Sequence, residues 1–471
     1  MNRYFRVSLA LALSLVFWAS GPSFAANLEV TSTAASCSDC DPTNDCSGDC
    51  SDPGVVCPFQ EALNIAQCND QDDTITLAAG TYNPNDVPLA DTGCSDDGFC
   101  YDGDSNAENF SLTITGAGKG LTFIDGGGNN ISGLMIEPLA TDDDGLNLTV
   151  TGITFQNNGP VSGSDAGGLL AAVQNATVLI QDNEFINNGG ERTGGGLFVG
   201  SFGTGVITVN RNAFFDNQAL SGVPGGGIGA DVLDGELILT NNILAGNLAE
   251  NNTGGGIYIE IDGIAPVRII HNTLFDNTAV VGGGILLEPC VGNTTDIYNN
   301  IIWQNTADAG GEDVAVVAGG GGECTPDGTI NLFNNDIINF EVLPGTITVN
   351  EGNNVDVDPL WAASAADDFH LTADSPVIDQ GDLSPPGGLP SPDFDLVTRP
   401  QGPLPDMGAL EFQVIPTPTP TPTATATPTP PFNAFLEGSG CSLGLLAGSP
   451  SAIAWLAAFG LLSAFSIRRH R

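Results

Sequence analysis

The fold is decided by a stretch that the chain repeats. Residues 225–247 read GGGIGADVLDGELILTNNILAGN, and residues 254–277 read GGGIYIEIDGIAPVRIIHNTLFDN. One marker is a glycine triplet followed by an aliphatic residue, which falls at Leu197, Ile228, Ile257 and Ile285, with a weaker copy at Leu169. The other is an apolar residue followed three places later by asparagine: Phe155/Asn158, Phe185/Asn188, Phe214/Asn217, Leu244/Asn247, Leu274/Asn277 and Ile302/Asn305. Both markers recur every 28 to 31 residues, so they belong to one structural repeat.

Short runs between the markers have the pattern of β-strands. Residues 206–209 and 237–239, for example, are rich in Val, Ile and Leu and show no helical spacing. A repeat of this size cannot bury its own apolar face and must stack on its neighbours. We therefore predict an all-β protein whose residues 111–340 form a right-handed parallel β-helix, a solenoid with strands about 4.8 Å apart along its axis.

A column of asparagines is expected to join the coils. Each lies two places before the apolar marker residue: Asn183, Asn212, Asn242, Asn272 and Asn300, with Asn335 beyond them. Asparagine tolerates the left-handed conformation of sharp turns. If the coils align, these amides can hydrogen-bond from one coil to the next, as in cross-β ladders.

Composition excludes several classes of protein. The 471 residues include 62 glycines without a Gly-X-Y period, which excludes collagen, and 41% hydrophobic residues, which excludes an acidic disordered tail. There are 56 acidic and 10 basic residues, for a net charge of −46. Such a surface repels phosphates, so we expect no nucleic-acid partner. Five basic residues lie between the two ends of the chain: Lys119, Arg192, Arg211, Arg268 and Arg399.

The two ends predict export and tethering. Residues 1–25 have a basic start, an apolar stretch and a small-residue site at Ser23-Phe24-Ala25, as in a secretory signal peptide. Residues 413–437 are a Pro/Thr linker. Residues 438–471 contain a Gly-Cys motif, an apolar run long enough to span a membrane and an arginine tail, which favours the cytoplasmic side. We expect an exported protein at the cell surface, or at the outer membrane facing outward, tethered by its C-terminal segment.

The cysteines predict a stapled N-terminal cap. Ten of the eleven cysteines lie in the exported body, in keeping with an oxidising compartment. Eight are concentrated near its start: Cys37, Cys40, Cys46, Cys50, Cys57, Cys68, Cys94 and Cys100. We expect residues 26–110 to form a disulfide-rich cap with the first coils, and Cys290 and Cys324 to make a further pair. Zinc at Cys37-x-x-Cys40 is the alternative, although no histidine is near.

Several motifs resemble known bacterial surface proteins. The Gly-Gly-x-Ile and Phe-x-x-Asn repeats resemble those of the polymorphic outer-membrane proteins, a family of β-helix adhesins. The stretches CPFQEAL (57–63), DTITLAAGTY (73–82), LTITGAG (112–118) and IDGG (124–127) resemble the opening of pectate-lyase-like β-helix surface proteins. Residues 341–412 resemble the choice-of-anchor Q region, through SPVIDQGD (375–382), Arg399-Pro400 and DMGALE (406–411). These resemblances imply architecture and leave the activity open.

The C-terminal segment resembles bacterial sorting tails. Such tails carry a Gly/Cys motif, a spanning helix and an arginine cluster, and an intramembrane protease cuts near the motif. Gly440 and Cys441 match that motif, so the resemblance implies processing there by a sorting protease. Retention of the uncut segment as a single-pass anchor is the alternative.

One repeat position offers basic side chains for catalysis. Arg211 and His271 both lie three places before the apolar marker, where other coils carry Asp182, Asn241 and Asn299. A polysaccharide lyase needs a base to take the proton next to a uronate carboxylate. Arg211 and His271 would be two coils apart, about 10 Å, which is too far for one proton-transfer pair. A salt bridge between Asp182 and Arg211 on adjacent coils is the simpler expectation.

A second repeat position is acidic. Asp231, Glu260 and Glu288 each lie four places after a glycine triplet, and strand alternation would direct them outward. Stacked carboxylates can bind Ca²⁺, serve as an acid/base pair for glycoside hydrolysis, or form a solvated acidic stripe. We expect the stripe; no cofactor is required, and Ca²⁺ is the optional ion.

The function that these features favour is a tethered structural or adhesive β-helix that binds polysaccharides or surface proteins without catalysis. Exposed aromatic side chains at Tyr258, Tyr298 and Trp303 would be its candidate sugar-stacking residues. The alternative is a divergent polysaccharide lyase or glycoside hydrolase that acts along the outer face of the coils.

Overall fold

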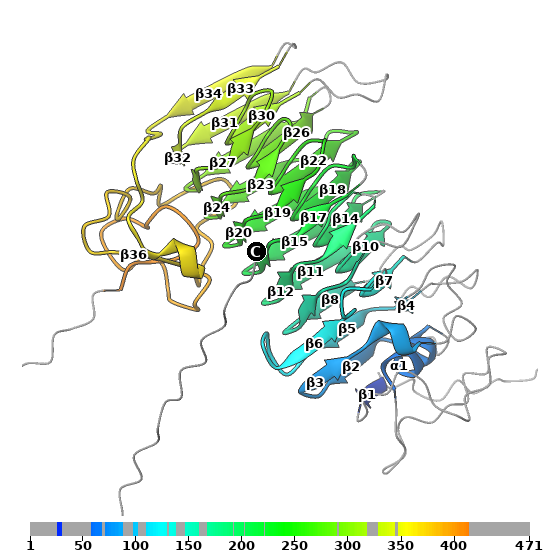
Figure 1. Cartoon of the computed structure of the whole chain (residues 1–471). Helices are drawn as coiled ribbons and strands as arrows, with labels where there is room; N and C mark the ends of the chain where they lie inside the picture. The colour runs from blue at the N-terminus through cyan, green and yellow to red at the C-terminus, as the bar shows by residue number, and fades with distance from the viewer. Residues whose placement is uncertain are drawn as a thin grey trace, which may run out of the picture. The chain divides into compact units, whose positions relative to one another are not determined.

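The structure is a computed structural model of the chain (Figure 1). It describes residues 26–30, 58–67, 71–87, 98–101, 110–129, 131–137, 147–159, 167–191, 193–201, 203–220, 222–289, 292–317, 328–343 and 347–413. The predicted signal peptide, most of the Pro/Thr linker and the C-terminal segment lie outside these residues. Cys100 forms a disulfide, and the other cysteines of the body lie outside the described residues. None of the described helices has the length and apolarity needed to cross a membrane.

Four parallel sheets build the described part of the solenoid. Sheet I consists of β1 (Ala26–Val30), β2 (Asp73–Leu77), β5 (Leu112–Thr115), β8 (Asn147–Thr151), β11 (Thr177–Gln181), β15 (Val206–Asn210), β19 (Glu236–Thr240), β23 (Val267–Ile270), β27 (Thr294–Tyr298), β31 (Thr329–Phe333) and β34 (Thr348–Gly352). Sheet II consists of β4 (Phe99–Tyr101), β7 (Leu134–Ile136), β10 (Leu169–Val173), β14 (Leu197–Ser201), β18 (Ile228–Val232), β22 (Ile257–Ile261), β26 (Ile285–Pro289), β30 (Val314–Val316) and β33 (Phe340–Val342).

Sheets III and IV close each coil. Sheet III consists of β3 (Gly80–Tyr82), β6 (Thr122–Asp125), β9 (Thr154–Gln156), β12 (Glu184–Ile186), β16 (Ala213–Phe215), β20 (Ile243–Ala245), β24 (Thr273–Phe275), β28 (Ile301–Trp303) and β32 (Asp336–Ile337). Sheet IV consists of β13 (Gly189–Gly190), β17 (Gln218–Ala219), β21 (Leu248–Ala249), β25 (Thr278–Ala279) and β29 (Thr306–Ala307). A complete coil passes through sheets II, I, III and IV in turn, as β18, β19, β20 and β21 do before β22 begins the next (Figure 1).

This topology is that of a parallel β-helix, and it is consistent with the right-handed form that the repeats predict. Strands of successive coils pair in parallel, and equivalent repeat residues face each other: Ile228 pairs with Ile257, and Ile257 pairs with Ile285. The apolar marker residues are fully buried in the core. Phe155, Phe185 and Phe214 stack there, with ring centroids 5.0 Å and 4.6 Å apart.

The predicted asparagine column is a continuous hydrogen-bonded ladder. At Asn242, the backbone N–H and Nδ2 both donate to Oδ1 of Asn272, at 3.0 Å each, and Nδ2 also donates to the carbonyl of Val209. Asn212 donates to Asn242 in the same way. The same pattern runs through Asn183, Asn212, Asn242, Asn272, Asn300 and Asn335.

A second ladder was not predicted. It uses the marker asparagines themselves, Asn158, Asn188, Asn217, Asn247, Asn277 and Asn305, with the same double donation to the next Oδ1. It also explains why the two sequence markers keep one phase. A Cβ added to Gly256, the last glycine of a triplet, would stand 3.2 Å from the Asn277 side chain and 2.7 Å from the Gly284 carbonyl. The glycine leaves room for the ladder amide.

The left-handed residues at the first corner are not the ladder asparagines, which corrects the expectation above. The residue with positive φ is the one before each ladder residue: Asp182, Arg211, Asn241, His271, Asn299 and Asn334, with φ between 55° and 60°. The turn is therefore completed before the asparagine, which leaves the amide free to point inward and meet its neighbours. Outside glycine this conformation costs roughly 1 kcal/mol, which the ladder offsets at Arg211 and His271.

Two non-repeating parts flank the repeats. At the N-terminal end, helix α1 (Phe59–Ala66), which the sequence did not predict, packs against the first coils. Its Phe59 ring lies 6.1 Å from that of Tyr82 and 4.8 Å from that of Phe99. After the last coil, residues 355–412 contain the antiparallel pair β35 (Trp361–Ala363) and β36 (Asp368–Leu371) and lie beside β20 and β24 (Figure 1). Two short 3-10 turns, Pro84–Asp86 and Ser364–Ala366, complete the described elements.

Replacing one ladder asparagine tests what joins the coils. We expect Asn242→Ala to lower the free energy of unfolding by about 3 kcal/mol, because the buried backbone N–H of Asn212 loses its acceptor and the bonds from Asn242 to Val209 and Asn272 are lost. The control is Asn350→Ala, whose exposed amide donates to Asn331 and whose loss should cost less than about 0.5 kcal/mol. Midpoints of denaturant unfolding followed by circular dichroism report both values. Equal effects would refute a structural role for the ladder.

Candidate functional site

The acidic column lies on sheet II. Asp231, Glu260 and Glu288 come from β18, β22 and β26 and face one another in register. All three are half-buried, so the column is less open to solvent than the sequence suggested. Tyr258, expected to be exposed, is only 7% exposed, and its hydroxyl lies 3.2 Å from Oε2 of Glu260 and 3.3 Å from Oε2 of Glu288.

Burial governs the ionisation of this column. Burial, together with the nearby Glu260 and Asp262 carboxylates, raises the pKa of Asp231 to about 6. Burial also raises the pKa of Tyr258, with help from Glu288 and Glu260, so the hydroxyl stays protonated and can donate. Within the described ranges no cluster of three or more His, Cys, Asp or Glu side chains is placed to hold a metal ion. Asp231, Glu260 and Glu288, the candidates for Ca²⁺, therefore do not form such a cluster.

The repeat position of Arg211 and His271, expected on the outer surface, is largely buried. The Arg211 guanidinium forms the expected salt bridge with Asp182, with Nε–Oδ1 at 2.8 Å and Nη2–Oδ2 at 2.7 Å. Asn241, His271 and Asn299 were expected on an outer column, but each is at most 1% exposed. The reason is that residues 378–412 cover this corner of the coils.

His271 is held as a structural neutral group. Its Nε2 lies 2.9 Å from the Asn299 amide nitrogen and so accepts from it, which leaves Nδ1 to donate to the Gly408 carbonyl at 3.3 Å. Burial and the Arg399 guanidinium lower its pKa well below the usual value. His271 and Arg211 are therefore not brought together as an acid/base pair, and no described residue completes one with His271.

The covering segment is fastened by a buried ion pair. Nη1 of Arg399 donates to Oε1 of Glu411 at 2.7 Å, and both side chains are fully buried. Nη2 of Arg399 donates to Oδ1 of Asn241 at 3.2 Å and to the Gly408 carbonyl at 3.0 Å. The backbone N–H groups of Asp406 and Gln401 complete the coordination of the Glu411 carboxylate. Arg399-Pro400 and the DMGALE motif were noticed in the sequence only as a family resemblance; here they join the C-terminal segment to the coils.

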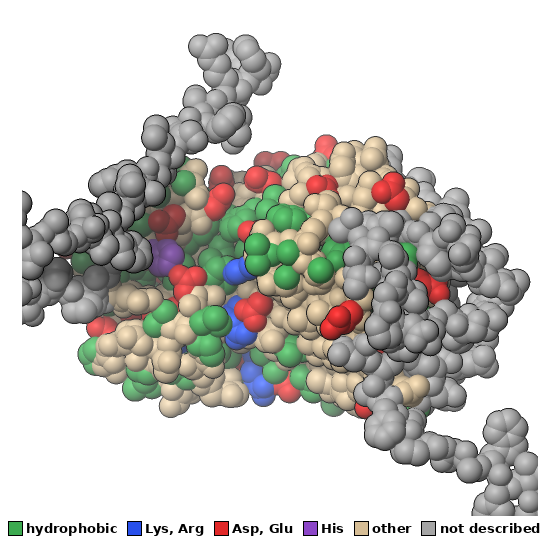
Figure 2. Space-filling model, turned by 90° about the horizontal axis from the view of Figure 1, so that it is seen from below, with side chains coloured by type: hydrophobic (Ala, Val, Ile, Leu, Met, Phe, Trp, Pro, Cys, Tyr) green, Lys and Arg blue, Asp and Glu red, His purple; other side chains and the backbone are tan. Residues whose placement is uncertain are grey.

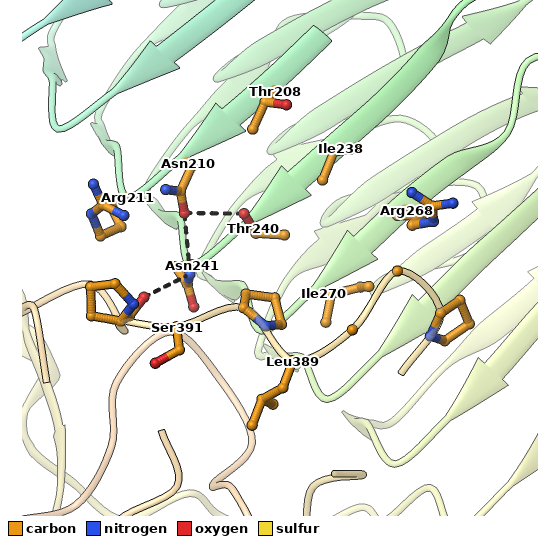
Figure 3. A pocket seen from close by; sticks show the side chains of 15 residues that line it. Thr208, Asn210, Arg211, Ile238, Thr240, Asn241, Arg268, Ile270, Leu389 and Ser391 are labelled. Carbon is orange, nitrogen blue, oxygen red and sulfur yellow. Dashed lines mark hydrogen bonds between the residues drawn. The ribbon is translucent and has the colours of Figure 1, made fainter. Parts of the chain in front are cut away.

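A cavity of about 240 Å³ lies between this segment and sheet I (Figure 3). Its floor is the outer face of β15, β19 and β23, with Thr208, Ile238 and Arg268, and its wall is the stretch 386–392. The Asn241 amide donates to Oδ1 of Asn210 and to the Pro392 carbonyl, which fixes the wall against the floor. Arg211 and Arg268 are the charged residues among those that line it.

Basic side chains gather on this side of the molecule. Arg211 and Arg268 line the cavity, Arg399 lies beneath the covering segment, and the Lys119 ammonium lies 3.7 Å above the centre of the Phe394 ring. Figure 2 shows basic side chains close together near the middle of the face it presents, next to acidic ones. Arg192, the remaining basic residue of the body, lies outside the described residues. The sequence shows how few these cations are, but only the fold brings them together.

Comparisons with known proteins add little to this geometry. No protein-family profile matches the chain, and no curated protein does. Among solved structures, the crystal structure of pectate lyase Pel9A is similar with a TM-score of 0.34 and 14% sequence identity, over 79% of this chain and 95% of that chain. A similarity this low carries no argument about activity, and the β-helix assignment rests on the strand pairing described above.

Breaking the buried ion pair should loosen the covering segment. We expect Arg399→Met to leave Glu411 as an unpaired buried charge, at a cost of about 3–5 kcal/mol. Hydrogen exchange should then accelerate at the amides of Gly408 and Ala409, which bond to Asn299 and Thr273, and stay slow in the strands of sheet I. The double variant Arg399→Met, Glu411→Met should recover much of the protection. Unchanged exchange in the single variant would contradict the role of the pair.

The stability of the body should fall as pH rises. Burial raises the folded-state pKa of Asp231 and Asp406 to about 6 and that of Asp336 to about 7, above the model-peptide value of 3.8. A raised carboxyl pKa favours the folded state at low pH, so its contribution is complete below pH ~4 and is lost as pH rises through ~6 to 7. Denaturant midpoints measured from pH 4 to pH 8 should decrease, and Asp231→Asn should flatten the decrease. Rising midpoints over this range would refute these assignments.

Proposed function

We propose that the chain is an exported, membrane-tethered β-helix that binds glycans or surface proteins without catalysis. One observation carries the proposal: the open-sided cavity between sheet I and residues 386–392 is lined by guanidinium, amide and hydroxyl groups and by no carboxylate, while His271 is buried and hydrogen-bonded on both ring nitrogens. This set can hold a polar ligand, and Arg211, the basic residue that the sequence offered for proton abstraction, is held there in a two-bond salt bridge with Asp182.

Export of the protein and its attachment to a membrane are part of the same proposal. They rest on the signal-like residues 1–25 and on the Pro/Thr linker, Gly440-Cys441 and the arginine tail. The relationship to polymorphic outer-membrane proteins and to the choice-of-anchor Q region rests on the motifs quoted above. An architectural role for this region is supported by the hydrogen bonds around the buried ion pair that fastens residues 378–412 to the coils. These bonds involve four residues of those motifs: Arg399, Asp406, Gly408 and Glu411.

A second function is favoured by one local feature. On sheet II, Asp231 has a pKa of about 6 and stands in register with Glu260, whose carboxylate the Tyr258 hydroxyl contacts. Two carboxyl groups in unequal environments are what a divergent glycoside hydrolase would use as acid and base. We rank this function second, because the cavity described above lies on sheet I, whereas Asp231 and Glu260 belong to sheet II.

Retention and turnover separate the two functions. We expect the full chain to be retained on an immobilised polysaccharide panel of acidic and neutral members and to release no reducing ends, with or without Ca²⁺. Glu260→Gln should leave retention unchanged, because this residue lies on a different sheet from the cavity. Release of reducing ends by the wild-type chain, lost in Glu260→Gln, would replace binding with hydrolysis.

A further inference from the structure

The cavity under the stretch 386–392 is lined by positive charge, although the protein as a whole is strongly acidic. The chain has 56 acidic and 10 basic residues, yet the charged groups lining the cavity are Arg211 and Arg268. Their ion-pair partners, Asp182 and Glu236, are not among the lining residues. A negatively charged group in the cavity would therefore contact the two guanidinium groups, whereas the carboxylates of Asp182 and Glu236 do not line the cavity.

Each guanidinium group keeps one terminal nitrogen, Nη1 of Arg211 and Nη2 of Arg268, without a hydrogen bond to the described residues. Arg211 uses Nε and Nη2 for Asp182 and Gln181, and its Nη1 makes no hydrogen bond to the described residues. Arg268 uses Nη1 for Glu236, whereas its Nε is buried without a partner. That Nε lies against Gly387 of the covering stretch, so the donors that a ligand can reach are the Nη1 of Arg211 and the Nη2 of Arg268. The planar N–H pairs of arginine suit a carboxylate or a similar oxyanion.

The rest of the lining suits the ring of a sugar. Thr208 and Thr240 bring hydroxyl groups and Ile238 brings apolar surface on the floor, opposite the stretch 386–392 (Figure 3). The volume of about 240 Å³ is below the roughly 300–1,000 Å³ of sites for drug-sized ligands, which limits the occupant to about one ring. Asn241 already joins the floor to the wall by donating to the Pro392 carbonyl, and Thr240 and Asn241 both bond to Asn210 within the floor, so the cavity exists before a ligand arrives.

We propose that this cavity binds one oxyanion-bearing sugar unit, with its anionic group between Arg211 and Arg268 and its ring against Ile238. The proposal rests on the glycan-binding function above and specifies its ligand class. A uronate carboxylate and a sugar sulfate share the chemistry that the two arginines recognise.

Calorimetric titration of the full chain tests the site with defined probes: galacturonate, galactose 6-sulfate and galactose. We expect a dissociation constant on the order of 1 mM for at least one anionic sugar and at least tenfold weaker binding of galactose. Arg268→Gln should weaken binding of the anionic sugar at least tenfold, and so should Arg211→Gln. The matched control is Lys119→Gln, which removes a cation of the same face that does not line the cavity and should change binding less than twofold.

A further variant protects the test against misfolding. Ile238→Phe keeps both arginines and enlarges a half-buried side chain on the outer face of β19, so it should fill the cavity and abolish binding without disturbing the core. Circular dichroism confirms the fold of each variant. Equal binding of galactose, or full binding by Arg268→Gln and Ile238→Phe, would overturn the site. If those variants are still retained on immobilised polysaccharide, the proposed function stands and this cavity is not its site; if the wild-type chain is not retained, the proposed function fails as well.

Discussion

The structure depends on the satisfaction of buried amides at the corners of the coils. A parallel β-helix turns sharply several times in each repeat, and at every turn backbone groups leave the sheet ladders and must find other partners inside the protein. Asparagine solves this because its side chain both donates and accepts. In Asn242 the side-chain oxygen takes two donors from Asn212, and its amide group bonds forward to Asn272 and back to Val209. The glycine triplets serve the same constraint, since Gly256 has no side chain that would collide with the Asn277 amide. Period, glycine and asparagine are thus three aspects of one packing condition.

This condition explains what could be predicted from the sequence. The coil, its strands and the ladder through Asn242 follow from residues that repeat locally, so their pattern is visible without coordinates. The asparagines of the second ladder, Asn247 and its equivalents, could also be identified in the sequence as a marker of the repeat. That they hydrogen-bond from coil to coil was not predicted. The position of the left-handed residue was missed because Arg211 and His271 are unusual there. The burial of His271 could not be predicted from repeats at all. It depends on Gly408, 137 residues away in a segment with no periodicity.

The fastening of that segment shows how a strongly acidic protein uses a rare cation. A buried guanidinium is costly unless its charge and its donors are met. Nη1 of Arg399 donates to Glu411 on its own segment, and Nη2 donates to Gly408 and to Asn241 of the coils. The ion pair therefore joins the segment to one particular corner of the coils. An apolar contact such as that between Phe369 and Phe275 adds area, but it would tolerate sliding along the stack of similar coils. The polar contacts distinguish one coil from the next, because the segment bonds to a different corner side chain on each of three coils, at Asn241, His271 and Asn299.

The same covering explains why a ligand site would lie on sheet I. The outward side chains of a β-helix are exposed on a nearly flat surface, and a flat surface encloses little. Where residues 386–392 cross over β15, β19 and β23, a second wall is added and a cavity results. The net charge of −46 then acts on any anion that approaches, since the long-range field of the protein repels it. Within a Debye length of about 8 Å at physiological ionic strength, the nearby guanidinium groups dominate instead. Selection of an anion at such a site must therefore come from short contacts with Arg211 and Arg268, and it cannot come from electrostatic steering.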